Sequence, residues 1–190
     1  MLTDIGVNLL HPQVTNDRQS VVARARAAGV SQMLVTATNL EEATAASALC
    51  AEQGPGLWCT AGVHPHTAKD VSPGWQSQLV ELVTRPQVKA VGEMGLDFYR
   101  DFSPRDVQIE VFRAQLAIAA AANKPAFVHD RDSGGMVHQL LSDQTPKPPG
   151  VVIHCFTGTR DELLGYLDAG YHIGITGWVC DQRRGAQLRE

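Results

Sequence analysis

The chain has 190 residues and a mass of 20.5 kDa, with 44% hydrophobic and 19% charged residues, which suits one well-buried domain over residues 1–190. Its net charge of −4 excludes a basic surface that would hold nucleic acid or an anionic membrane by charge alone. The four cysteines lie far apart without a Cys-x-x-Cys pair, so the sequence suggests neither a disulfide framework nor a cysteine zinc site.

No targeting or membrane segment is expected. The first residues reach Asp4 without a basic region or a sustained apolar stretch, unlike a signal peptide. The longest apolar tract, residues 118–122, is far shorter than the roughly 20 residues that a membrane span needs. We therefore expect a soluble, cytoplasmic protein with no membrane partner.

Short β-branched runs alternate with segments of helical spacing along the whole chain. The predicted strands are residues 2–7, 33–36, 57–63, 88–92, 126–129, 151–154 and 171–176. This alternation predicts a parallel sheet, because parallel neighbours need crossover connections. Two architectures satisfy it, a doubly wound open sheet and a (β/α)8 barrel.

The clearest predicted helix follows Ser103 and runs to about Asn123. We expect Ser103 to cap it and Pro104 to take its first position. Apolar residues at helical spacing predict the face that packs on the sheet. They are Val107, Val111, Ala114 and Ile118, flanked by Phe112, Leu116 and Ala119.

Side chains with chemical capacity recur where the predicted strands end. They are His64, His66, Glu93, Asp97, His129, Arg131, Asp132 and His154. In both architectures the carboxyl edge of the sheet is where sites are built, and in a barrel all strand ends converge on one mouth. This convergence predicts a functional site at that edge.

Glu93, His129 and His154 each end an otherwise apolar strand. One carboxylate and two neutral imidazoles form a ligand set for a divalent metal. Any one of the histidines alone would more simply cap a strand or lie satisfied in the core. A metal held there lowers the pKa of bound water and polarises a phosphoryl or carbonyl oxygen, so the three together predict metal-assisted hydrolysis.

The remaining polar residues have two interpretations each. The proline between His64 and His66 marks a turn, which leaves the role of both histidines open. His64 binds metal, phosphate or neither, and His66 is the weaker candidate of the two. Asp97 and Asp132 are candidates to orient or deprotonate the water, although Asp97 equally suits an Asx contact in a turn. Arg131 either pairs with Asp132 or clamps a phosphate.

Aromatic residues flank the predicted site. Phe98, Tyr99 and Phe156 stand beside these polar positions, and the bases of single-stranded nucleic acid stack on such rings. For Phe156 we expect core packing instead.

With these residues the chain resembles the TatD family of metal-dependent deoxyribonucleases, part of the wider metal-dependent hydrolase barrels. The matching stretches are DIGVNL (4–9), AGVHPH (61–66), GEMGLD (92–97), VHDRD (128–132), HCFTG (154–158) and GITGW (174–178). The resemblance implies that Glu93, His129 and His154 bind the metal. It also implies a magnesium-dependent exonuclease that degrades single-stranded DNA and RNA from the 3′ end.

Two departures from the wider family stand out. Most members begin with Asp-x-His-x-His, whereas this chain has Gly6 and Asn8, the form of the TatD branch itself. The family's Thr-Asp-Ala-Pro-like motif on a further strand does not occur after Trp178. We therefore expect a TIM-type (β/α)8 barrel that lacks its last βα unit.

We predict a monomeric metal-dependent phosphodiesterase with a divalent ion, Mg²⁺ first and Mn²⁺ or Zn²⁺ as alternatives. In this prediction Glu93 and Asp97 are catalytic, and His64 and Arg131 contact the substrate phosphate. One alternative is a hydrolase of an acyl or amide bond, such as that of a mischarged aminoacyl-tRNA, because the same metal set serves either reaction. Another is an inactive truncated remnant that still binds metal.

Overall fold

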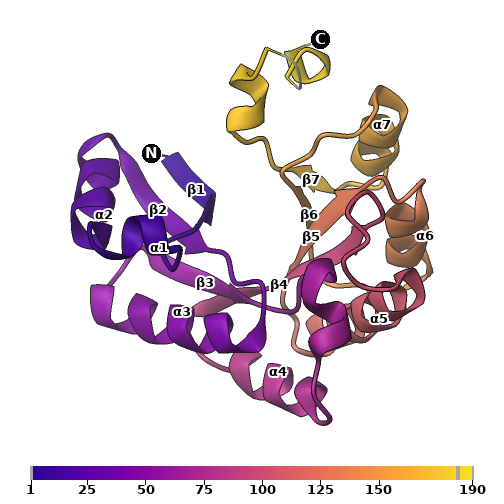
Figure 1. Cartoon of the computed structure of the whole chain (residues 1–190), viewed down its shortest axis with the longest axis horizontal. Helices are drawn as coiled ribbons and strands as arrows, with labels where there is room; N and C mark the ends of the chain where they lie inside the picture. The colour runs from indigo at the N-terminus through magenta and orange to yellow at the C-terminus, as the bar shows by residue number, and fades with distance from the viewer. Residues whose placement is uncertain (1, 183–184, 190) are drawn as a thin grey trace.

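Seven strands form one curled parallel sheet in the computed structural model, which describes residues 2–182 and 185–189 (Figure 1). The strands are β1 (Leu2–Val7), β2 (Val30–Val35), β3 (Leu57–Ala61), β4 (Val88–Asp97), β5 (Ala126–Arg131), β6 (Val151–His154) and β7 (His172–Ile173). They pair in chain order. A doubly wound sheet reverses its strand order at a switch point, so this order selects the barrel architecture, one strand short of eight.

The helices cover the outer side of the curl (Figure 1). They are α1 (Pro12–Thr15), α2 (Arg18–Ala27), α3 (Leu40–Gln53), α4 (Trp75–Val83), α5 (Arg105–Ala121), α6 (Met136–Asp143) and α7 (Arg160–Asp168), with 3₁₀ turns η1 (Pro65–Asp70), η2 (Gly177–Cys180) and η3 (Gln187–Arg189). Among the described residues, no helix combines the length and the apolar character that a membrane crossing requires.

The strand β4 extends past the predicted end at Gly92 and reaches Asp97. Two glycines permit this extension, because Gly92 and Gly95 have φ of 143° and 139°, in the region that favours glycine. A Cβ on Gly95 would lie only 1.9 Å from the backbone oxygen of His129. The end of β4 therefore lies directly against β5, and its acidic residues face the end of that strand.

The helix α5 confirms the predicted helix, but Ser103 does not cap it. Pro104 occupies the capping position and makes no side-chain hydrogen bond to the first turn. The Ser103 hydroxyl instead donates to the carbonyl of His66 at 3.0 Å and accepts from the amide of Lys69 at 3.1 Å. Ser103 thus joins the start of α5 to η1, a long-range contact that local sequence rules do not contain.

The buried face of α5 is also rotated from the predicted one. Its buried residues are Gln108, Val111, Phe112, Gln115, Leu116 and Ala119. By contrast, Val107, Ala114 and Ile118 pack only partly against the core. The rotation brings two glutamines, seven residues apart, into contact with the sheet.

These two glutamines satisfy the backbone where the strand ladders stop. The Gln115 amide accepts from the Val63 N–H at 2.7 Å and donates to the Val63 carbonyl at 2.9 Å. The Gln108 amide accepts from the Asp97 N–H at 2.8 Å and donates to the Ser103 carbonyl at 2.7 Å. Buried backbone groups need such partners, so α5 fixes the chain just before His64 and at Asp97.

Replacing Gln115 by methionine tests this role. The change keeps the side-chain length but leaves the buried N–H and carbonyl of Val63 without partners, so the free energy of unfolding should fall by about 2–4 kcal/mol in urea denaturation. Gln139→Met, on the exposed side of α6, is the control and should change it by about 0.5 kcal/mol or less. Equal stabilities for the two variants would contradict the proposed clamp.

Candidate metal centre

One imidazole lies between two buried carboxylates at the ends of β4 and β5. The Nδ1 atom of His129 is 3.0 Å from Oε1 of Glu93, and its Nε2 atom is 3.3 Å from Oδ2 of Asp97. Glu93 is buried, and the Asp97 side chain is 0% exposed. Two negative charges removed from water in this way require a compensating charge close by.

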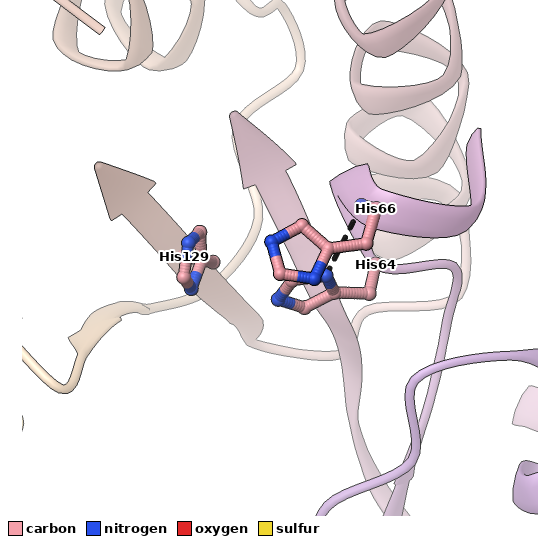
Figure 2. Close-up of side chains that lie close together, drawn as sticks. All are labelled: His64, His66 and His129. Carbon is pink, nitrogen blue, oxygen red and sulfur yellow. Dashed lines mark hydrogen bonds between the residues drawn. The ribbon is translucent and has the colours of Figure 1, made fainter. Parts of the chain in front are cut away.

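Two more histidines complete the cluster from the start of η1. Nε2 of His64 is 3.6 Å from Oε1 of Glu93, and Nε2 of His66 is 2.7 Å from Oδ2 of Asp97. Figure 2 shows the rings of His64, His66 and His129 gathered together, with the His66 amide bonded to Nδ1 of His64. Each of these three imidazoles offers a nitrogen within 4.8 Å of the others.

His66 therefore contacts the centre, although the sequence made it a weaker candidate than His64. Pro65, the proline between the two histidines, does mark a turn, because it is the first residue of η1. It directs His66 onto Asp97, 31 residues away in sequence. The sequence did hold a signal for this contact: a proline often takes the first position of a helix, and such a turn keeps the two flanking histidines close together.

The electrostatics of the cluster follow from these contacts. Burial opposes ionisation of Glu93, but hydrogen bonds from His129 and His64 outweigh it and hold the pKa of the Glu93 carboxyl well below its usual range. The pKa of Asp97 is lowered against burial in the same way by His129, the Arg100 amide and His66. Burial disfavours a charge on His129, yet Asp97 and Glu93 raise its pKa to about 9.

His154 approaches the same region from β6, where it pairs in register with His129. Its Nδ1 atom is buried and has no hydrogen-bond partner. Burial lowers the pKa of His154, partly offset by Glu93, so the ring is a neutral imidazole with an unused nitrogen. Its surroundings include an open cleft of ≈ 470 Å³ between β1 and the segment 174–177.

Gly6 on β1 leaves the space that this imidazole occupies. A Cβ at Gly6 would lie 2.6 Å from Cε1 of His154. The residue that departs from the wider family's histidine pattern thus has a steric reason to be glycine in this chain.

The donor set fits a divalent ion. Carboxylate oxygens and neutral imidazole nitrogens are ligands for Mg²⁺, Mn²⁺ and Zn²⁺ in different proportions. His154 has a buried nitrogen without a hydrogen-bond partner, and the two buried carboxylates share the imidazole of His129. A cation bound among these groups would provide the missing interactions. Glu93 and His129 are in direct contact, and His154 is on the adjacent strand.

Of the other predicted residues, Asp97 makes the contact expected of a turn, whereas Arg131 lies against an aromatic ring, which neither of its two interpretations included. One oxygen of Asp97 accepts the Arg100 N–H at 2.9 Å, the predicted Asx contact, while its other oxygen faces the histidines. The guanidinium of Arg131 lies 4.6 Å from the centre of the Tyr99 ring, and Asp132 is exposed. Phe156 is buried in the core, as expected.

Gln108 and Gln115 are the supporting residues that sequence reasoning missed. They lie seven residues apart on the otherwise apolar side of α5. Two glutamines at that spacing among buried residues were the available signal, because a polar group on a buried face requires a hydrogen-bond partner.

Comparison with known proteins gives one consistent family. The family described as "TatD related DNase" matches residues 3–190. The chain is 53% identical over 188 residues to the "3'-5' ssDNA/RNA exonuclease TatD" of Pantoea vagans, covering 98% of this chain and 72% of that protein. It is 51% identical over 187 residues to the protein of the same name from Klebsiella pneumoniae, covering 98% and 71%.

Solved structures agree with this family. A TatD homologue from Escherichia coli superposes with a TM-score of 0.86 at 28% identity, covering 94% of this chain and 69% of that one. A hydrolase of the TatD family from Entamoeba histolytica superposes with a TM-score of 0.85 at 29% identity, covering 93% and 65%.

Adding a methyl group at Gly6 should disturb His154 specifically. Gly6→Ala places a Cβ against the imidazole, which turns away, so Mn²⁺ affinity measured by calorimetry should fall about tenfold or more with little change in the urea midpoint. Gly177→Ala is the matched control, because a Cβ there meets nothing within 4 Å. Unchanged Mn²⁺ affinity in Gly6→Ala would show that His154 is not a ligand.

The stability of the metal-free protein should depend on pH through His129. Its folded pKa of about 9 lies above the unfolded value of about 6.5, so its stabilisation is complete below pH 6.5 and is lost as the pH rises to 9. The loss should be on the order of 3 kcal/mol in urea titrations with EDTA. Glu93 and Asp97, whose pKa values are lowered, act oppositely and lose their contribution only in acid.

The variant His129→Gln isolates this effect. It removes the titrating group, so the decline between pH 6.5 and 9 should disappear. The same decline in the variant and the unmodified protein would assign it to another group.

Proposed function

Since this chain belongs to the TatD-related DNase family, we propose that it is a metal-dependent exonuclease that hydrolyses phosphodiester bonds of single-stranded DNA and RNA from the 3′ end. The observation that carries the proposal is the contact of 3.0 Å between Glu93 and His129 at the adjoining ends of β4 and β5. This contact forms a buried centre of one carboxylate and one imidazole. The chain that carries it is about half identical in sequence to proteins described as 3′-5′ ssDNA/RNA exonucleases.

Glu93, His129 and His154 would hold the divalent ion, for which we propose Mg²⁺, with Mn²⁺ or Zn²⁺ as alternatives. A bound ion of this kind polarises the phosphoryl oxygen and lowers the pKa of water. Glu93 is ionised in the folded protein and needs no deprotonation before it binds a cation. His129, by contrast, must release its proton, because a ligating nitrogen has to be free of it.

Asp97 acts through the histidine that it orients. Its Oδ2 atom accepts from Nε2 of His66, which leaves Nδ1 of that imidazole able to accept a proton. The His66 side chain is 23% exposed, whereas Asp97 is fully buried, so His66 is the member of the pair that reaches the mouth. We therefore propose that Asp97 orients the imidazole while His66 moves the proton.

His64 and Arg131 are the proposed contacts of the substrate phosphate. His64 is next to Glu93, and Arg131 leaves the end of β5 two residues after His129. A guanidinium binds phosphate oxygens in a bidentate manner, which places the scissile group over the strand ends.

The relatives found do not favour the alternatives raised by the sequence, a hydrolase of acyl or amide bonds and an inactive remnant. The expected monomeric state and the cytoplasmic location stay predictions from the sequence.

Replacing Glu93 by glutamine tests the proposal. The change keeps the shape but removes the charge, so the rate at which a 5′-labelled single-stranded oligonucleotide is shortened in Mg²⁺ should fall about a hundredfold or more. Glu110→Gln, at an exposed position on α5, is the control and should retain full activity. Undiminished shortening by Glu93→Gln would contradict the assigned centre.

A further inference from the structure

Two aromatic side chains are exposed directly beside the candidate centre. They are Tyr99, 64% exposed, and Phe102, 55% exposed, in the loop between β4 and α5. Among the large hydrophobic side chains exposed in the described part of the chain, these two are the only aromatic ones. Apolar rings left in water beside a site indicate a binding surface rather than core packing.

The loop that carries the rings is firmly anchored. The Arg105 guanidinium donates to the Asp101 carboxylate at 2.7 Å and to the Phe98 carbonyl at 3.1 Å. At its ends, the loop is held by the Asp97 bond to the Arg100 amide and by the Ser103 bond to η1. The rings of Tyr99 and Phe102 are therefore presented to solvent by an ordered segment.

Both rings also contact residues of the centre. The Phe102 ring centroid lies 4.9 Å from that of His66, which bonds Asp97. The guanidinium of Arg131 lies 4.6 Å from the centre of the Tyr99 ring, and Arg131 pairs in register with Asp97. A cation on one ring face leaves the other face available, as in sites that stack nucleobases.

We propose that Tyr99 and Phe102 form a platform on which the bases next to the scissile phosphodiester stack. The proposal rests on the proposed function and adds to it the source of its preference for single strands. A base paired and stacked within a duplex cannot place its face on a protein ring, whereas an unpaired base can. The platform therefore selects unpaired ends, while the strand-end residues bind the phosphate.

Binding measurements test the platform separately from catalysis. We would measure the Kd of a 5′-fluorescein-labelled single strand by anisotropy in Mg²⁺, with phosphorothioate linkages at the 3′ end to slow hydrolysis. Tyr99→Leu and Phe102→Leu keep apolar bulk but remove the aromatic plane, and each should weaken binding about tenfold. Tyr99→Trp should restore it, and Leu167→Ala, an exposed apolar residue on α7, should change nothing.

An oligonucleotide whose last nucleotides are abasic distinguishes stacking from a structural role. The unmodified protein should bind it about as weakly as the leucine variants bind the ordinary strand, and the variants should lose little further affinity. Equal losses on both strands, or no loss on either, would overturn the platform. If the unmodified protein neither binds nor shortens the ordinary strand, the proposed exonuclease function fails as well; if it shortens the strand and the variants bind normally, only the platform fails.

Discussion

The burial of two carboxylates on one strand is the constraint on which the rest of the structure depends. Glu93 and Asp97 lie four residues apart on β4, and a buried charge without a partner costs several kcal/mol. The imidazole of His129 contacts both carboxylates. His64 also contacts Glu93, and His66 also contacts Asp97. The Arg100 guanidinium also lies 3.6 Å from Oδ2 of Asp97. Once His129 releases its proton, the two carboxylates outnumber this one cation, and the remaining negative charge suits a metal ion, which is the basis of the proposed metal centre.

The surrounding fold serves this cluster. Gly95 lets β4 approach β5 closely enough for Asp97 to reach His129, and Gly6 leaves room for the imidazole of His154. Gln108 binds the backbone of Asp97 itself, and Gln115 binds the residue before His64. The helix α5 thus contributes hydrogen bonds as well as apolar packing, because the ladder between β3 and β4 ends at Ala61 and Val91, before His64 and Asp97.

The sequence predicts the architecture and part of the centre, for reasons that are local. Alternating strands and helices follow from periodicity, and the polar residue that ends each apolar run places Glu93 and His129 at one edge. The contacts that periodicity cannot predict join distant segments, such as Gln115 to Val63, 52 residues apart, and Ser103 to His66, 37 residues apart. They depend on how α5 and η1 are oriented on the sheet, which is settled only by packing.

Anomalous diffraction from a crystal soaked in Mn²⁺ tests the account most directly, because it locates the ion without reference to activity. We expect a peak at coordination distance from Glu93, His129 and His154, about 2.0–2.2 Å from the ligand atoms. A peak held by His64, His66 and His129 alone, or a peak away from the ends of β4, β5 and β6, would contradict it.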